Sequence, residues 1–118
     1  MKIALITLFP EMLEAVTRFG VSGRAVKNEV IEINCFNPRE FAEDLHKTVD
    51  DRPYGGGPGM VMQIDPLRLA IGAAREWIGG ETLVVYLSPQ GALLDQNAVN
   101  SFSNSDSLVL VAGRYEGI

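Results

Sequence analysis

The residues best suited to binding chemistry lie in the segment 50–60, whose sequence is DDRPYGGGPGM and which contains four glycines and two prolines. Glycine adopts backbone conformations that are closed to other residues and leaves main-chain N–H groups uncovered, whereas Pro53 and Pro58 stiffen the path of the chain. A loop of this kind suits a planar or anionic ligand. The alternative is an ordinary surface loop without a ligand, which glycine content alone does not exclude.

This segment does not match the two common phosphate-binding patterns. A P-loop requires Lys and then Ser or Thr after its glycines, where this chain has Pro58, Gly59 and Met60. A dinucleotide-binding fingerprint that begins at Gly55 requires glycine at position 60, and residues 53–54 before it do not read as a buried strand. The sequence therefore excludes both patterns.

Two further turns follow predicted strands. The turn SPQG at 88–91 comes after the apolar run 82–87, and the turn GRYEG at 113–117 comes after the apolar run 107–112. In open α/β sheets, ligands bind beyond the carboxyl ends of the strands. We therefore predict that both turns are binding loops, and ordinary loop chemistry is the alternative for each of them.

The charges give a weaker signal. The net charge of −5 argues against a chain that wraps a nucleic acid by itself, because non-specific affinity for phosphates comes mostly from Lys and Arg. Any contact with RNA must be local. Arg39, Lys47 and Arg52 cluster around His46, but five acidic residues lie among them, so a binding patch and a solvated loop explain the cluster equally well.

The first part of the chain must position these loops through short alternating elements. Residues 2–8 predict a strand, and apolar side chains at helical spacing from Met12 to Phe19 predict a helix that ends at Gly20. A second, short helix is predicted over 22–28 with Ser22 as its N-cap. A strand over 30–36 then ends at Asn37-Pro38, and one or two helical turns follow within 39–45.

The second part of the chain continues the alternation. Asp65 is the predicted N-cap of a helix with proline at its first position, and Gly79-Gly80 ends that helix after Ile78. The run 82–87 predicts a strand covered on both faces, and 95–102 predicts a short helix. The run 107–112 predicts another fully apolar strand. Alternating strands and helices indicate an α/β fold with a mainly parallel sheet.

The end of the sequence is unusual for such a fold. The last apolar strand is followed only by residues 113–118, with no helix to cover it. An uncovered apolar strand at a sheet edge is an aggregation hazard. We therefore expect this strand to be exposed at an edge of the sheet and the chain to be cut short.

Length and composition favour one globular domain. The chain has 118 residues and 47% hydrophobic residues. Its single cysteine, Cys35, rules out an internal disulfide and, with His46 as the single histidine, argues against a zinc or haem site. The apolar start of the chain is interrupted by Pro10, too early for a signal peptide or a membrane span. We expect a cytoplasmic protein without a membrane partner.

Four segments together carry a resemblance to a known family. They are FPE at 9–11, DDRPYGGGPGM at 50–60, YLSPQG at 86–91 and GRYEGI at 113–118, and GRAVKN at 23–28 adds to them. The chain resembles the bacterial tRNA (guanine-N1)-methyltransferase (TrmD) family from Met1 to Ile118, over about the first half of a family member. The resemblance implies an S-adenosylmethionine-dependent enzyme of the trefoil-knotted SPOUT class. A homodimer that methylates the guanine 3′ to the tRNA anticodon, with magnesium assisting, is also implied.

The resemblance also implies site residues. For the cofactor these are Tyr86, Leu87, Ser88, Pro89 and Gln90 in one loop and Gly113, Arg114, Tyr115, Glu116 and Gly117 in the other. Leu87 and Pro89 suit the faces of the adenine ring. The guanine is expected near Gly59 and Glu116, and weaker candidates for contacts with the RNA are Asp50, Arg52 and His46. Glu116 as an anchor for Arg114 and His46 as a plain surface histidine are the alternatives.

The resemblance places no catalytic residue in this chain. In the family an aspartate removes the guanine proton with help from an arginine, and both follow the position of Ile118, as do the end of the knot and the C-terminal RNA-binding domain. Residues 1–118 are thus expected to form an incomplete N-terminal cofactor-binding domain that does not methylate tRNA alone. One alternative is a non-catalytic fragment that dimerises and binds an adenosine-like ligand weakly or not at all. Another is an unrelated nucleotide-dependent transferase, which protection by ATP against heating would favour.

Overall fold

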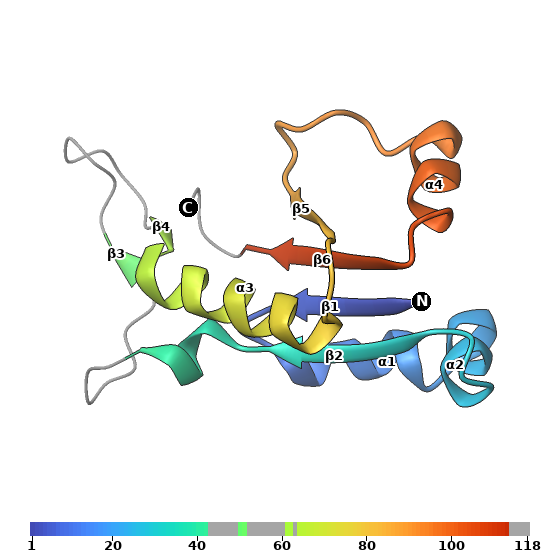
Figure 1. The fold of residues 1–118 in the computed structure, drawn as a ribbon, viewed down its shortest axis with the longest axis horizontal. Coiled ribbons are helices and arrows are strands. Elements are labelled where there is room, and N and C mark those ends of the chain that lie inside the picture. Colours follow the sequence, from blue (N-terminus) through green and yellow to red (C-terminus); the bar gives the residue numbers. More distant parts are fainter. Residues whose placement is uncertain (43–49, 52–60, 63, 114–118) are drawn as a thin grey trace.

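A four-stranded parallel sheet forms the centre of the computed structural model, which describes residues 1–42, 50–51, 61–62 and 64–113. Its strands run in the order β2-β1-β6-β5, and every neighbouring pair is parallel. Their bounds are β1 Lys2–Ile6, β2 Glu32–Phe36, β5 Leu83–Leu87 and β6 Ser107–Ala112. The prediction of an α/β fold with a parallel sheet is confirmed (Figure 1).

One face of the sheet is covered by helix α3 (Ile64–Ile78), which packs on β1, β2 and β6. The helix approaches closely because Ala70 and Ala74, at 0% exposure, face the sheet. Ile6 and Val109 fill the sheet side of this core. Burial of these apolar side chains between helix and sheet is the main stabilising contribution to the fold.

The burial of β5 and β6 differs from the sequence-based expectation. Strand β6, the last of the chain, lies between β1 and β5 and is mostly buried, so the expectation that it forms an exposed edge is wrong. Strand β5 instead lies at one edge of the sheet, with β2 at the other. Its Leu83 and Leu87 are about half exposed, so the expectation that β5 is covered on both faces is also wrong. The reason is the non-local pairing of β6 with β1, which moves the last strand inward.

The segment after β1 differs in its helix bounds from the two predicted helices, which covered 12–19 and 22–28. It forms the 3₁₀ helix η1 (Pro10–Leu13), a short α1 (Glu14–Thr17) and α2 (Gly20–Lys27). Gly20 has a φ of +66°, and α2 begins there rather than after Ser22. Ser22 is not an N-cap, because its hydroxyl donates a hydrogen bond of 2.6 Å to the carbonyl of Val16 instead of accepting one from an N–H group.

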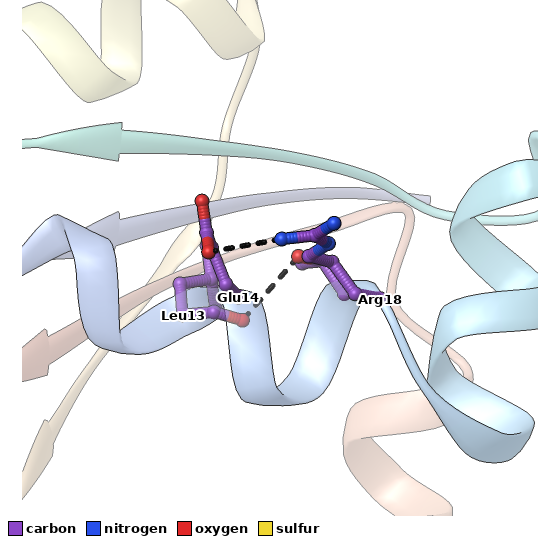
Figure 2. A network of polar contacts seen from close by, with 4 residues as sticks. Leu13, Glu14 and Arg18 are labelled. Atoms are coloured by element: carbon purple, nitrogen blue, oxygen red, sulfur yellow. Dashed lines mark hydrogen bonds and ion pairs between the residues drawn. The ribbon is translucent and has the colours of Figure 1, made fainter.

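Two side-chain bonds link successive turns of α1 and its flanking residues. Figure 2 shows Arg18 beside Glu14, with 3.4 Å between guanidinium and carboxylate, and each side chain is 65% exposed, so the pair adds little stability. The Thr17 hydroxyl donates to the carbonyl of Leu13. The closer contact is between backbones: a Cβ on Gly23 of α2 would lie 2.8 Å from the carbonyl carbon of Arg18. The absence of a side chain at Gly23 allows this approach.

The connection from β2 to α3 contains a small hairpin that the sequence did not reveal. The 3₁₀ helix η2 (Pro38–Phe41) begins after Asn37, whose side chain accepts a bond from the N–H of Arg39. Strands β3 (Asp50–Asp51) and β4 (Val61–Met62) then pair antiparallel. This pairing brings together the two ends of the glycine-rich segment shortly before α3 begins. In Figure 1 the arrows of β1, β2 and β6 point to the side on which this pair lies.

The remaining helix ends follow local rules. Helix α3 starts at Ile64, two residues before the predicted first helical residue, Pro66, so Asp65 lies in its first turn and is not its N-cap. It ends as predicted at Gly79, which has a φ of +82°. Helix α4 (Gln96–Ser103) also starts as predicted, with the Asp95 carboxylate accepting a 2.8 Å bond from an N–H of the first turn. No helix within the described part of the chain is both long and apolar enough to cross a membrane.

Candidate functional site

The first predicted loop leaves β5 and forms a self-bonded turn. Tyr86 and Leu87 are the last residues of β5, and the N–H of Gly91 donates a 3.2 Å bond to the carbonyl of Ser88. The N–H of Gln90 donates a 3.1 Å bond to the hydroxyl oxygen of the same serine. The predicted turn at 88–91 is therefore confirmed, and two of its N–H groups are satisfied within the turn.

A cavity of about 740 Å³ opens beside this turn, between the sheet and α4. Its volume is within the range of small-molecule sites. Four of the predicted cofactor residues line it, namely Tyr86, Leu87, Ser88 and Pro89. The sheet contributes Val85, Leu108 and Leu110, and α4 contributes Ala98, Val99 and Phe102. All of the side chains that line this cavity are uncharged, so it suits an apolar or aromatic group.

The second predicted loop starts at Gly113, directly after β6, and touches the first one. A Cβ placed on Gly113 would lie 3.1 Å from Cε2 and 3.2 Å from the hydroxyl oxygen of Tyr86. The structure thus brings together one residue from each predicted cofactor loop. The other residues of the second loop, Arg114, Tyr115, Glu116 and Gly117, lie outside the described residues, and their roles stay predictions.

The structure does not test the contacts expected for the predicted substrate residues. Gly59, Arg52, His46 and Glu116 lie outside the described residues. Asp50 is the first residue of β3, where its backbone pairs with that of Met62. The proposed contacts of all five with RNA therefore stay predictions.

Sequence reasoning missed two parts of the site. One is the wall formed by α4 and by the loop before it, where Leu93 is 86% exposed and Leu94 is 64% exposed. The other is a smaller cavity of about 440 Å³ at the carboxyl ends of β1 and β6, lined by residues that include Phe9 and Gly113. The sequence signal that could have found this wall is the pair Leu93-Leu94. Two leucines in a polar connection need an apolar surface to pack against, and the neighbouring residues do not supply one.

The titratable groups described by the structure do not converge on the cavity. Partial burial raises the pKa of the Cys35 thiol above its ordinary value, but Cys35 lies on β2, at the edge of the sheet opposite β5. The described residues contain no cluster of three or more His, Cys, Asp or Glu side chains that would suit a metal ion. Magnesium therefore stays an expectation from the family resemblance, and we derive no step through it.

Comparison with known proteins places this geometry in a family. The sequence model described as "tRNA (Guanine-1)-methyltransferase TrmD" matches residues 1–118. The chain belongs to this family. Two curated TrmD-family relatives, each named tRNA (guanine-N(1)-)-methyltransferase, come from Shewanella sediminis, at 60% identity, and Mannheimia succiniciproducens, at 58% identity. Both matches cover 100% of this chain, but only 49% and 46% of the respective relative.

A solved structure of the TrmD family has the same fold. The tRNA (m1G37) methyltransferase from Aquifex aeolicus matches with a TM-score of 0.86 and 32% sequence identity. The match covers 99% of this chain and 52% of that chain. The chain thus spans about half the length of the relatives it matches, and the resemblance noted in the sequence is confirmed.

Proposed function

We propose that this chain supplies the cofactor-binding part of an S-adenosylmethionine-dependent tRNA (guanine-N1)-methyltransferase. The observation that carries the proposal is the contact between Tyr86 and Gly113, which joins the two loops that the family resemblance assigns to the cofactor beside an uncharged cavity. The cofactor, when bound, supplies the methyl group. The substrate is the guanine 3′ to the anticodon, with Gly59 and Glu116 near the base and Asp50, Arg52 and His46 near the RNA.

The residues around the cavity are suited to hold an adenosine. Leu87 and Pro89 supply apolar surfaces of the kind that pack against an aromatic ring. Because the N–H groups of Gln90 and Gly91 are already bonded within the turn, we expect the turn to recognise polar edges of the ligand through its carbonyl groups. The chain's contribution to the reaction is then binding and orientation, which place the methyl group in line with the guanine nitrogen.

The remaining chemistry is proposed for the part of the relatives that extends beyond this chain. Removal of the guanine proton needs a general base, and the family resemblance assigns that base to a position after Ile118. In this proposal residues 1–118 form the N-terminal cofactor-binding portion of a SPOUT-type domain. The rest of the trefoil knot, the RNA-binding part, the second subunit of a homodimer and a cytoplasmic location are proposed with it.

One observation fits the alternative of a non-catalytic fragment as well as it fits the proposal. Leu83 and Leu87 on the edge strand, and Leu93 and Leu94 in the loop before α4, are between 49% and 86% exposed. An exposed apolar surface of this kind marks either an interface or a surface that another segment covers. A fragment that folds, pairs and binds an adenosine-like ligand weakly would show the same surface.

A chimera tests the proposed function. The first 118 residues of the Shewanella sediminis relative, which align with this whole chain, are replaced by this chain. Transfer of labelled methyl groups from S-adenosylmethionine is then measured to tRNA transcripts with guanine or adenine 3′ to the anticodon. We expect transfer to the guanine transcript by the chimera and none by the second half of the relative alone. A chimera that folds but transfers no methyl group would contradict the proposal.

A further inference from the structure

The contact between Tyr86 and Gly113 explains why a glycine stands at the end of β6. The φ of Gly113 is not in the left-handed region, so the backbone conformation itself does not require glycine. The space that a side chain would enter is instead occupied by the Tyr86 ring, 3.1 Å from the Cβ position. In the strand register Tyr86 faces Val111 and Leu87 faces Ala112, so the ring extends past the ladder to reach Gly113. The ring therefore crowds this position and must shift by a few tenths of an ångström if a side chain is introduced there.

We propose that Tyr86 is a positioning residue whose ring, resting on Gly113, fixes the end of β6 relative to the turn at 88–91. This inference rests on the proposed function, because it concerns the geometry in which the two loops meet S-adenosylmethionine. Tyr86 lines the larger cavity and Gly113 lines the smaller one. A displacement of the Tyr86 ring therefore acts where the ends of β5 and β6 meet.

Exposure of the ring determines what a side chain at position 113 would do. Tyr86 is 41% exposed, and the atoms nearest to the Cβ position belong to its ring rather than to the backbone. A methyl group at position 113 would therefore push the ring outward without disturbing the core. Gly113→Ala is expected to weaken ligand binding while leaving the unfolding transition nearly unchanged, a separation that a purely structural role would not produce.

The test is a double-mutant cycle on the 118-residue chain. The dissociation constant of S-adenosylmethionine is measured by calorimetric titration for the wild type, Gly113→Ala, Tyr86→Ala and the double variant, and urea unfolding is measured for each. Gly80→Ala is the matched control, because Gly80 precedes β5 at its other end and a Cβ there would meet nothing within 4 Å.

We expect Gly113→Ala to weaken binding roughly tenfold in the wild-type background and not at all in the Tyr86→Ala background, as coupled neighbours do. Gly80→Ala should bind like the wild type. Equal losses in both backgrounds, or no loss in either, would overturn the positioning role while leaving the proposed function intact. A wild-type chain that does not bind S-adenosylmethionine would instead refute cofactor binding by this chain and the positioning role with it.

Discussion

Two helical glycines allow the packing of this fold to be tested with a single type of substitution. Gly23 is buried in α2, and a Cβ there would lie 2.8 Å from the carbonyl carbon and 3.3 Å from the carbonyl oxygen of Arg18. Both atoms belong to the backbone, so no side-chain rotation relieves the contact. Gly72 lies in α3, where a Cβ would meet nothing within 4 Å. Replacement by alanine therefore separates crowding from helix propensity.

The expected magnitudes follow from these distances. Alanine is favoured over glycine in a helix by about 0.5–1 kcal/mol, and both variants receive this contribution. Gly72→Ala should therefore raise the free energy of unfolding by about that amount. Gly23→Ala also introduces overpacking, which typically costs about 1–3 kcal/mol. Its net effect should be a loss of up to about 2.5 kcal/mol, and it should be less stable than Gly72→Ala by about 1–3 kcal/mol. The difference between the two variants measures the crowding between α2 and the end of α1.

The assay is urea unfolding followed by the fluorescence of Trp77, the single tryptophan of the chain. Trp77 suits this purpose because its ring packs near that of Phe36, with 6.1 Å between centroids, and reports on the contact of α3 with the sheet. Equal stabilisation by both substitutions would refute the reasoning, since it would show that the backbone of Arg18 does not crowd position 23. Equal destabilisation would refute it as well, because Gly72 has open space around it.

Three other predictions concern single side chains. Lys2→Met should lower the free energy of unfolding, measured in urea, by about 1 kcal/mol. The reason is that the Lys2 ammonium donates a 3.3 Å bond to the Trp77 carbonyl and lies 5.1 Å from the Trp77 ring centroid. Unchanged stability would show that these contacts contribute nothing. In the same assay Asp95→Ala should lower the free energy of unfolding by about 1 kcal/mol, because α4 loses its N-cap. Asp95→Asn should keep most of the stability, since asparagine also caps helices. Equal losses in the two variants would argue against capping. Because burial raises the pKa of Cys35, the unfolded chain releases the thiol proton at a lower pH than the folded chain does. The free energy of unfolding should therefore fall as the pH rises above the ordinary thiol pKa. This fall, measured by comparing unfolding at neutral and alkaline pH, should be smaller in Cys35→Ala. Parallel pH profiles of the two proteins would contradict this prediction.

Local signals in the sequence were sufficient for much of the fold. Asp95 and Gly79 mark helix ends because capping and left-handed backbone conformations depend on the residue itself. The turn at 88–91 forms from bonds among its own residues. Apolar runs and helical spacing predicted the four strands of the sheet and α3, since these periodicities depend on neighbouring residues.

Non-local pairing explains most of what the sequence could not show. Strand β6 is interior because it pairs with β1, more than a hundred residues away in sequence, and the edge position then falls to β5. The antiparallel pair β3–β4 consists of strands of two residues each, too short to leave a pattern. The wall formed by α4 beside the larger cavity depends on the path of the loop before it. The contact of Tyr86 with Gly113 likewise depends on strand register, which residue types alone do not determine.

The central claim is that the loops at 86–91 and at the end of β6 form a site for S-adenosylmethionine. The most direct test is a calorimetric titration of S-adenosylmethionine into the 118-residue chain, beside the chimera that carries the second half of the Shewanella sediminis relative. We predict saturable binding to one site in the chimera, and weaker binding of the same stoichiometry in the chain alone, because the chain supplies two loops and an open cavity. No binding by either protein, with both shown to be folded, would contradict the account.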